Sequence, residues 1–157
     1  MSEISRYDRQ YFVGVGGDKT PLWTPVGEGF LRFEEKKNPQ EVYRRYYHEE
    51  DLRGDIDGYS SEIVYEAELV KGSAAIDKLN RIANEELFGK EGAVEIMTVD
   101  FFNEVLPGVY RAYVRAYSVC PENCGEGAES LKIRGRLIAN GELTIGQFIS
   151  STGTFTE

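Results

Sequence analysis

The sequence has few of the residues on which enzymes and metalloproteins depend. It contains one histidine, His48, and two cysteines, Cys120 and Cys124, in 157 residues. A zinc site needs about four ligands. A Ser-His-Asp or Cys-His arrangement would have to use His48, which lies in a stretch rich in Tyr and Arg, and no nucleophile motif such as G-x-S-x-G occurs. The sequence therefore predicts no enzyme, no metal site and no cofactor.

Long hydrophobic runs and an excess of positive charge are also missing. No apolar stretch approaches the ~20 residues of a membrane-spanning helix. The first residues, "MSEISRYDRQYF", carry charge where a signal peptide has an apolar core. A net charge of −9 argues against a general binder of nucleic acid or of anionic membranes. We expect a chain that is made and used in a cytoplasm and does not bind membranes.

Three short stretches invite comparison with ligand-binding motifs. "VGVGGD", 13–18, lacks the third glycine of a dinucleotide fingerprint and is followed by no helical pattern. "RGDIDGYSSE", 53–62, places the wrong residues at the ends of a calcium loop. We interpret both as turns built by Gly and Asp. "CPENC", 120–124, is interpreted as a Pro-containing turn, with a local disulfide or half of a shared metal site as alternatives.

The remaining pattern is that of an antiparallel β protein. Turn signals recur at short intervals between runs rich in Tyr, Val, Ile and Phe. The expected fold is a mainly β antiparallel sandwich or flattened barrel with one flanking helix. The predicted strands lie near 29–35, 41–48, 61–70, 93–102, 109–119, 130–139 and 142–150.

One stretch has helical rather than strand periodicity. In "SAAIDKLNRIANEELFG", 73–89, apolar residues recur on one stripe, as in an amphipathic helix. Ser73 is a plausible N-cap and Gly89 can end the helix. We predict one helix over about 73–88 that covers a sheet or a sheet opening.

Alternation is clear in 61–70, where Ile63 and Tyr65 share one face and acidic residues occupy the other. These acids, Glu62, Glu66 and Glu68, are candidates for a solvent or lumen surface. Later, "RGRLIANGELTIGQFI", 134–149, places Asn140 and Gly141 between two alternating segments. An Asn-Gly pair in this setting predicts a two-residue hairpin turn.

Two predicted strands interleave arginine with tyrosine, a mixture that is enriched at protein–protein interfaces. A solvated sheet face is an equally weighted alternative, and the acidic net charge disfavours stacking on nucleic-acid bases. The candidate interface residues are Tyr43, Arg45, Tyr47, Arg111, Tyr113, Arg115 and Tyr117.

The order of these pieces resembles the major tail tube proteins of long-tailed bacteriophages and the related tubes of contractile injection machines. The resemblance begins at "RYDRQYFVGVGG", continues through "KNPQEVYRRYYHEEDLRGDIDGYSSEIVYEAEL" and includes one helix that begins with "KGSAAID". It ends in a segment of the form I-x-G-x-L-x-x-N-G-E-L, formed by Ile133, Gly135, Leu137, Asn140, Gly141, Glu142 and Leu143.

The resemblance implies a structural subunit of a phage tail tube, with 1–157 as a single domain that has a flexible N-terminal segment and loops. Copies of such a subunit form rings, commonly of six, that stack into a tube with a channel for DNA. The implied partners are other copies, a tape-measure protein, terminator or initiator proteins, and DNA that passes without specific binding. The implied location is a virion tail assembled in the host bacterial cytoplasm.

Two alternative functions remain open from the sequence. The same fold can serve as a tube subunit of a contractile secretion or bacteriocin-like device that delivers protein. A small β-barrel that binds a peptide or small molecule on a Tyr-lined face is the other alternative.

Overall fold

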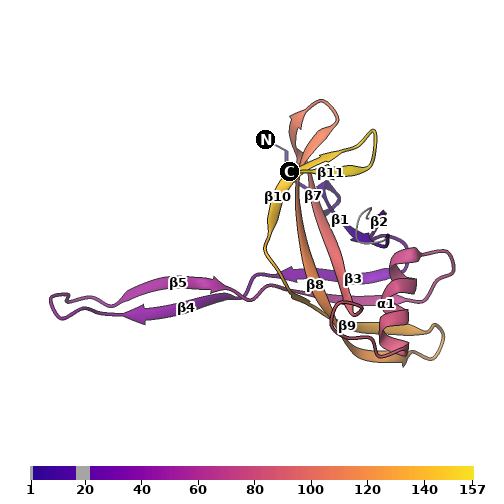
Figure 1. Ribbon diagram of the computed structural model, residues 1–157, viewed down its shortest axis with the longest axis horizontal. Coiled ribbons are helices and arrows are strands. Elements are labelled where there is room, and N and C mark those ends of the chain that lie inside the picture. The colour runs from indigo at the N-terminus through magenta and orange to yellow at the C-terminus, as the bar shows by residue number, and fades with distance from the viewer. Residues whose placement is uncertain (1, 17–21) are drawn as a thin grey trace.

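The computed structural model describes residues 2–16 and 22–157 and is built around one curled antiparallel sheet. Nine strands form this sheet: seven follow the order β2-β1-β7-β8-β9-β6-β3, and β10 and β11 extend it beside β8. Two further strands, β4 and β5, form a separate sheet that projects from the body (Figure 1). The strands are β1 (Arg9–Gly14), β2 (Trp23–Pro25), β3 (Phe30–Lys36), β4 (Pro39–Arg44), β5 (Arg53–Tyr59), β6 (Glu62–Glu68), β7 (Ala93–Leu106), β8 (Val109–Glu126), β9 (Lys132–Ala139), β10 (Thr144–Ile149) and β11 (Thr154–Thr156).

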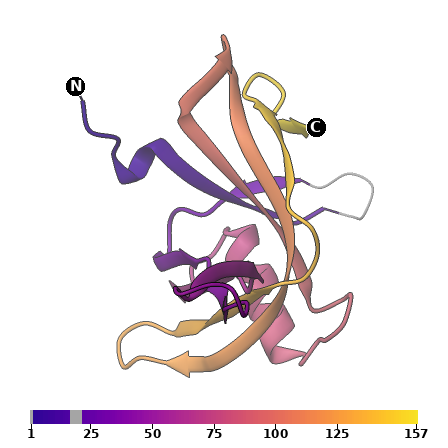
Figure 2. The same cartoon turned by 90° about the vertical axis from the view of Figure 1, so that its left-hand side faces the viewer.

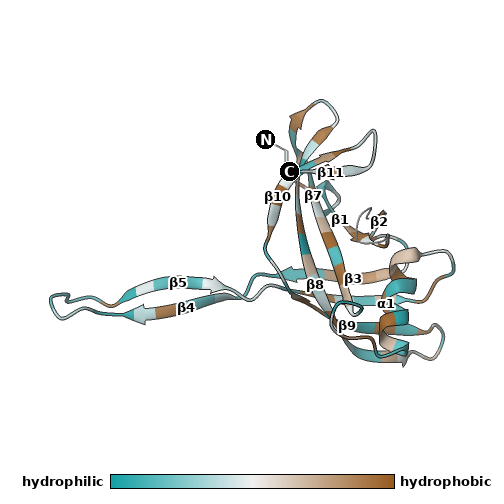
Figure 3. Cartoon of the chain, in the orientation of Figure 1, coloured by the Kyte–Doolittle hydropathy of each residue, from teal (hydrophilic) through white to brown (hydrophobic). Residues whose placement is uncertain are grey.

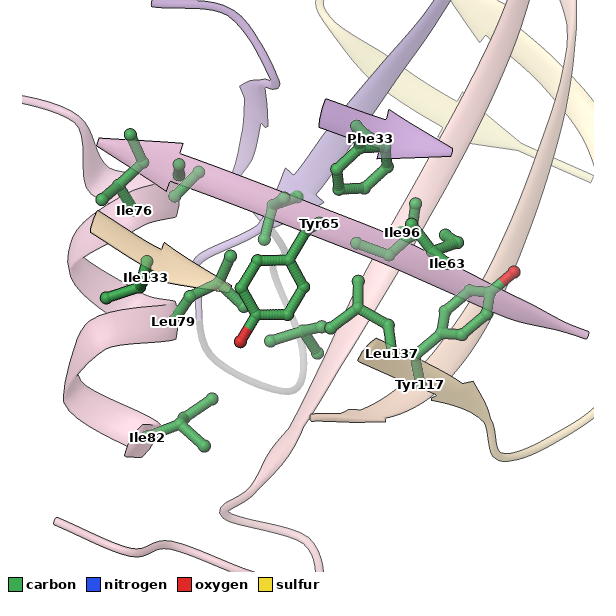
Figure 4. Close-up of a cluster of buried hydrophobic side chains, with 14 residues drawn as sticks. Phe33, Ile63, Tyr65, Ile76, Leu79, Ile82, Ile96, Tyr117, Ile133 and Leu137 are labelled. Atoms are coloured by element: carbon green, nitrogen blue, oxygen red, sulfur yellow. The ribbon is translucent and has the colours of Figure 1, made fainter. Parts of the chain in front are cut away.

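The curled sheet forms a half-barrel, and helix α1 (Ala74–Asn84) packs into its concave side. Side chains from α1, β6 and β9 meet between the helix and the sheet (Figure 4). Alternation on β6 produces this arrangement, because Ile63, Tyr65 and Ala67 are buried while their neighbours on the strand are only partly covered. The main core comprises Val13, Phe33, Ile63, Tyr65, Ala67, Ala75, Ile76, Leu79, Ile82, Val94, Ile96, Tyr117, Ile133 and Leu137.

A second, smaller core occupies the opposite face of β7 and β8. Met97, Val99, Ala112 and Phe148 are buried there, and Phe148 stacks on Phe12 with ring centroids 5.5 Å apart. The strands β7 and β8 are therefore covered on both faces over part of their length. This arrangement confirms the predicted mainly β fold with one helix, in the form of a flattened half-barrel.

The helix is shorter than the predicted 73–88. Ser73 caps it as expected, because its hydroxyl accepts the N–H of Ile76 at 3.4 Å. At the other end Glu86 adopts a φ of +51°, and the N–H of Leu87 donates to the carbonyl of Ile82 at 3.0 Å. These are features of a Schellman cap, which turns Leu87 back toward the main core. Glycine is the residue usually found at such a left-handed position. Because glutamate occupies it here, the sequence pattern did not indicate where the helix ends.

The predicted hairpin at Asn140 and Gly141 is wrong. β9 and β10 do not pair with each other; both run antiparallel to β8, β9 along one part of it and β10 along another. Gly141 has a φ of +138°, but Asn140 is not among the residues with positive φ, as a type I′ turn would require. The Asn140 N–H donates to the carbonyl of Ala116 at 2.9 Å. The two residues thus lie between β9 and β10, which pair in succession with β8.

The turns predicted at 53–62 and 120–124 are also wrong. Most of the first segment is strand β5, whose backbone groups are satisfied by pairing with β4. The second lies inside β8, where register shifts beside Pro121 and Cys124 mark bulges opposite β9. In the stretch 13–18, Val13 and Gly14 belong to β1, while residues 17 and 18 lie outside the described residues.

Candidate assembly surfaces

The hairpin formed by residues 39–59, termed here the arm, pairs with no other strand of the described sheets. At its base the Ser60 N–H donates to the carbonyl of Asn38, and the Asn38 side-chain amide donates to the carbonyl of Ser60, each at 3.1 Å. From this base the two strands extend away from the body, and Figure 2 views them end-on. The arm is thus anchored at one end and surrounded by solvent over its length.

No residue of the arm is buried, although the arm carries large apolar side chains. Figure 3 shows isolated hydrophobic positions among mainly hydrophilic residues along it. A lone two-stranded hairpin is marginally stable in water. Large exposed apolar side chains on such an element favour a role in contacts with another molecule. Those exposed side chains are Tyr43, Tyr46, Tyr47, Leu52, Ile56 and Tyr59.

The tip of the arm, 45–52, is ordered by contacts of its own. The Arg53 Nε lies 2.9 Å from Glu49 Oε2, and the Arg53 guanidinium lies 5.8 Å from the centre of the Tyr46 ring. Tyr46 also stacks on His48, with ring centroids 6.4 Å apart. The only histidine in the sequence therefore packs in an exposed turn, where it is 80% exposed.

The predicted Arg/Tyr interface residues fall into two separate places. Tyr43, Arg45 and Tyr47 lie on the arm and are exposed. Arg111, Tyr113, Arg115 and Tyr117 lie on β8 in the body. Tyr117 is 4% exposed and belongs to the main core, and burial raises the pKa of its hydroxyl, as does the nearby Glu35 carboxylate. Tyr117 therefore presents far less surface to a partner than the tyrosines of the arm do.

A cleft of about 160 Å³, termed here the inner cleft, opens beside these β8 residues. Polar side chains from four strands and the residue after β3 line it, and the apolar Ile96 and Leu143 complete its wall. The polar lining residues are Arg9, Glu35, Lys37, Thr98, Tyr113, Arg115 and Tyr117.

Two of the cations at the inner cleft are held by carboxylates. Arg9 binds Asp100 through Nε at 2.6 Å and through Nη2 at 3.2 Å, and Asp100 is 3% exposed. This hydrogen bond raises the pKa of the Arg9 guanidinium. Lys37 contacts the Glu35 carboxylate. Tyr11 lies close by, and burial, followed by the charge of Glu35, raises its pKa to about 12.

Sequence patterns did not identify Arg9, Asp100, Glu35 or Lys37 as members of one site. Arg9 precedes the first predicted strand, and the missed strand β1 brings it opposite Asp100 in register. Alternation within 93–102 places Asp100 on the same face as Ile96 and Thr98. This is the one sequence pattern that could have assigned Asp100 to the site.

The candidate lumen acids lie on the outer face of β6, and cations surround them. Glu62 accepts a hydrogen bond from Arg136 at 3.1 Å, and Arg136 also donates to Glu122 at 2.7 Å. Hydrogen bonds to Glu122 and then to Glu62 raise the pKa of Arg136. Glu66 is paired in register with Arg32 and Arg134 on the flanking strands, and Glu68 accepts from the Ser130 hydroxyl at 3.2 Å. This face carries alternating charges rather than uniform negative charge.

The cysteines are not joined to each other. Both thiols are free, which excludes the local disulfide, and the Cys124 Sγ lies 3.2 Å from Asn84 Oδ1 on α1. Within the described residues no group of three or more His, Cys, Asp or Glu side chains is placed to hold a metal ion. No helix in residues 2–16 and 22–157 has the length and apolar character needed to cross a bilayer.

No family model and no curated protein sequence matches the chain. Three solved structures share its fold. The sheath/tube terminator of an extracellular contractile injection system, PVC, in the extended state has a TM-score of 0.54 and 12% identity, covering 92% of this chain and 97% of that chain. The tube-terminating cap of the anti-feeding prophage, AFP, has a TM-score of 0.53 and 14% identity over 92% and 91% of the two chains.

The third structure is the PVC sheath–tube complex in the extended state. Its TM-score is 0.51 at 11% identity, with coverage of 91% of this chain and 90% of that chain. At such identities the likeness establishes a shared fold. The chain therefore has the tail-tube-related fold found in components of contractile injection systems.

Proposed function

We propose that the chain is a structural subunit of a phage-tail-type tube, in which copies form rings, six to a ring, that stack around a central channel. The cargo of the channel is DNA, and the assembled particle is a virion tail built in the bacterial cytoplasm. Tape-measure, terminator and initiator proteins are its further partners. The arm carries this proposal, because it is an ordered element without a core of its own whose large apolar side chains face solvent.

The edges of the curled sheet support the same proposal. β3 pairs only with β6 and β2 only with β1 among the described strands, so each leaves one edge unpaired. Unpaired edges favour strand addition from a second molecule, which in a ring turns an aggregation risk into a specific contact. Copies joined in this way form a closed ring when the rotation between them closes.

The outer face of β6 remains our candidate for the channel wall. Its acids, Glu62, Glu66 and Glu68, are balanced by neighbouring cations, so the face is hydrophilic with little net charge. Such a surface offers a passing polyanion neither a strong barrier nor a strong binding site.

The same subunit in a protein-delivering contractile device is the second candidate. The fold likeness to parts of the PVC and AFP systems favours it. Tube assembly is common to both candidates, and the cargo separates them.

Negative-stain electron microscopy of the purified chain at rising concentration tests the proposal. We expect rings or stacked tubes with a central opening, together with fast-sedimenting species in the ultracentrifuge. A chain that stays monomeric over the full concentration range contradicts tube assembly and favours the small binding module. Triggered ejection from assembled particles then separates the cargoes, since release of DNA is expected only from a DNA channel.

A further inference from the structure

The inner cleft contains positive charge that the chain itself does not neutralise. Arg9 and Lys37 have carboxylate partners, whereas Arg115 forms no ion pair within the described residues. Arg111 forms none either, and it lies beside the cleft on β8, in register with Asp100. In addition, the Nε of Arg115 is buried and has no hydrogen-bond acceptor. Arg111 and Arg115 flank Tyr113 on β8, and strand alternation places all three on one face.

A buried arginine N–H without an acceptor lowers the stability of the fold, unless another molecule supplies the acceptor. The guanidinium presents donors in a planar fork that fits a carboxylate through two parallel hydrogen bonds. Tyr113 and Leu143 at the cleft add apolar surface and one hydroxyl beside that charge. The chemistry that completes this site is a carboxylate carried on a polypeptide with apolar neighbours.

The tip of the arm has this chemistry. Glu50 and Asp51 are exposed and form no ion pair in the described part of the chain, whereas the neighbouring Glu49 is held by Arg53. Tyr47 and Leu52 beside them are exposed apolar side chains. The two acids are therefore free to meet cations on another surface.

The tip and the inner cleft lie at opposite ends of the arm within one molecule. Glu35 and Lys37, which line the cleft, are at the base of the arm, and the tip extends away from the body (Figures 1 and 2). The strands of the arm, β4 and β5, have six and seven residues, so each spans roughly 20 Å. The tip therefore reaches the cleft of another molecule rather than its own.

We propose that the inner cleft binds the acidic tip of the arm from a second copy of the chain, with Glu50 pairing with Arg115 in the cleft and Asp51 pairing with Arg111 beside it. This inference rests on the proposed self-assembly and identifies one of its contacts. Because tip and cleft are different surfaces, the contact is head-to-tail and each bound copy leaves a free tip and a free cleft for the next.

Charge reversal on each side tests this contact by sedimentation velocity. E50R/D51R in the tip and R115E in the cleft should each raise the concentration needed for assembly by about ten- to hundredfold, the range expected for breaking close charge pairs. The tip variant changes exposed residues only, so its fold is preserved even if the cleft variant is unstable. K71E, which makes the same charge change as R115E but at an exposed turn, should assemble as the unmodified chain does.

The chain that carries R115E and E50R together, with Asp51 and Arg111 unchanged, is the decisive variant. Its swapped charges should restore assembly to within a few-fold of the unmodified chain. Assembly of E50R/D51R at the same concentration as K71E would overturn the contact while leaving tube assembly intact. Failure of the unmodified chain to assemble would overturn the proposed function itself, so the two failures are distinguishable.

Discussion

The arm and the body are both built from antiparallel strands with tyrosines, yet the same residue type has opposite surroundings in the two regions. Tyr65 on β6 is 1% exposed between the helix and the sheet, whereas Tyr47 at the tip of the arm is fully exposed. Burial raises the pKa of Tyr65 well above its usual value. The body encloses its apolar side chains within one chain, and the arm presents them outward, so stability and assembly are expected to depend on different regions.

Truncation in the main core should give the largest loss of stability. Leu79 on α1 is fully buried, and Leu79→Ala is expected to lower the free energy of unfolding by about 2–5 kcal/mol through lost burial and a residual cavity. Tyr47→Ala in the arm removes more atoms but should change the same quantity by no more than about 0.5 kcal/mol. Urea denaturation followed by circular dichroism measures both, and comparable losses would erase the distinction between the regions.

The buried ion pair beside the inner cleft should give an intermediate effect. Asp100→Asn removes the charge that holds Arg9, and we expect a loss of about 1–3 kcal/mol in the free energy of unfolding. The loss stays below that of a fully enclosed pair because Arg9 is half-exposed and remains hydrated.

Glu34→Gln provides the matched control for that measurement. It breaks the ion pair between Arg32 and Glu34, in which both side chains are half-exposed. Solvent screening makes such pairs nearly neutral for stability. No measurable change is expected, and equal effects of the two substitutions would show that burial of Asp100 does not matter.

The spacing of apolar residues predicted many strands and the helix of the body, because the apolar positions are the buried ones there. The alternation of Ile63, Tyr65 and Ala67 and the apolar stripe of α1 both face the main core. Gly135 lies within β9 for a reason that only packing reveals. A Cβ there would lie 2.5 Å from the Cys120 carbonyl oxygen and 2.9 Å from the Tyr65 hydroxyl oxygen.

Strand partners were the part that local signals could not predict. The pair Asn140 and Gly141 suits a hairpin, but β8 is long enough to pair with β9 and β10 in succession, so tertiary pairing decides the connection. β5 was taken for a turn because its Gly and Asp residues are tolerated on a strand exposed on both faces. The inner cleft was missed for a related reason, since its residues come from strands distant in sequence.

Removal of the arm tests the central claim most directly. Residues 40–58 can be replaced by Asn-Gly, because Pro39 and Tyr59 are already partners at the base and the Asn38–Ser60 hydrogen bonds remain. We predict that this variant keeps the unfolding free energy of the full chain and sediments as a monomer at concentrations where the full chain forms rings or tubes. Assembly of the armless variant at the same concentration as the full chain would contradict the account.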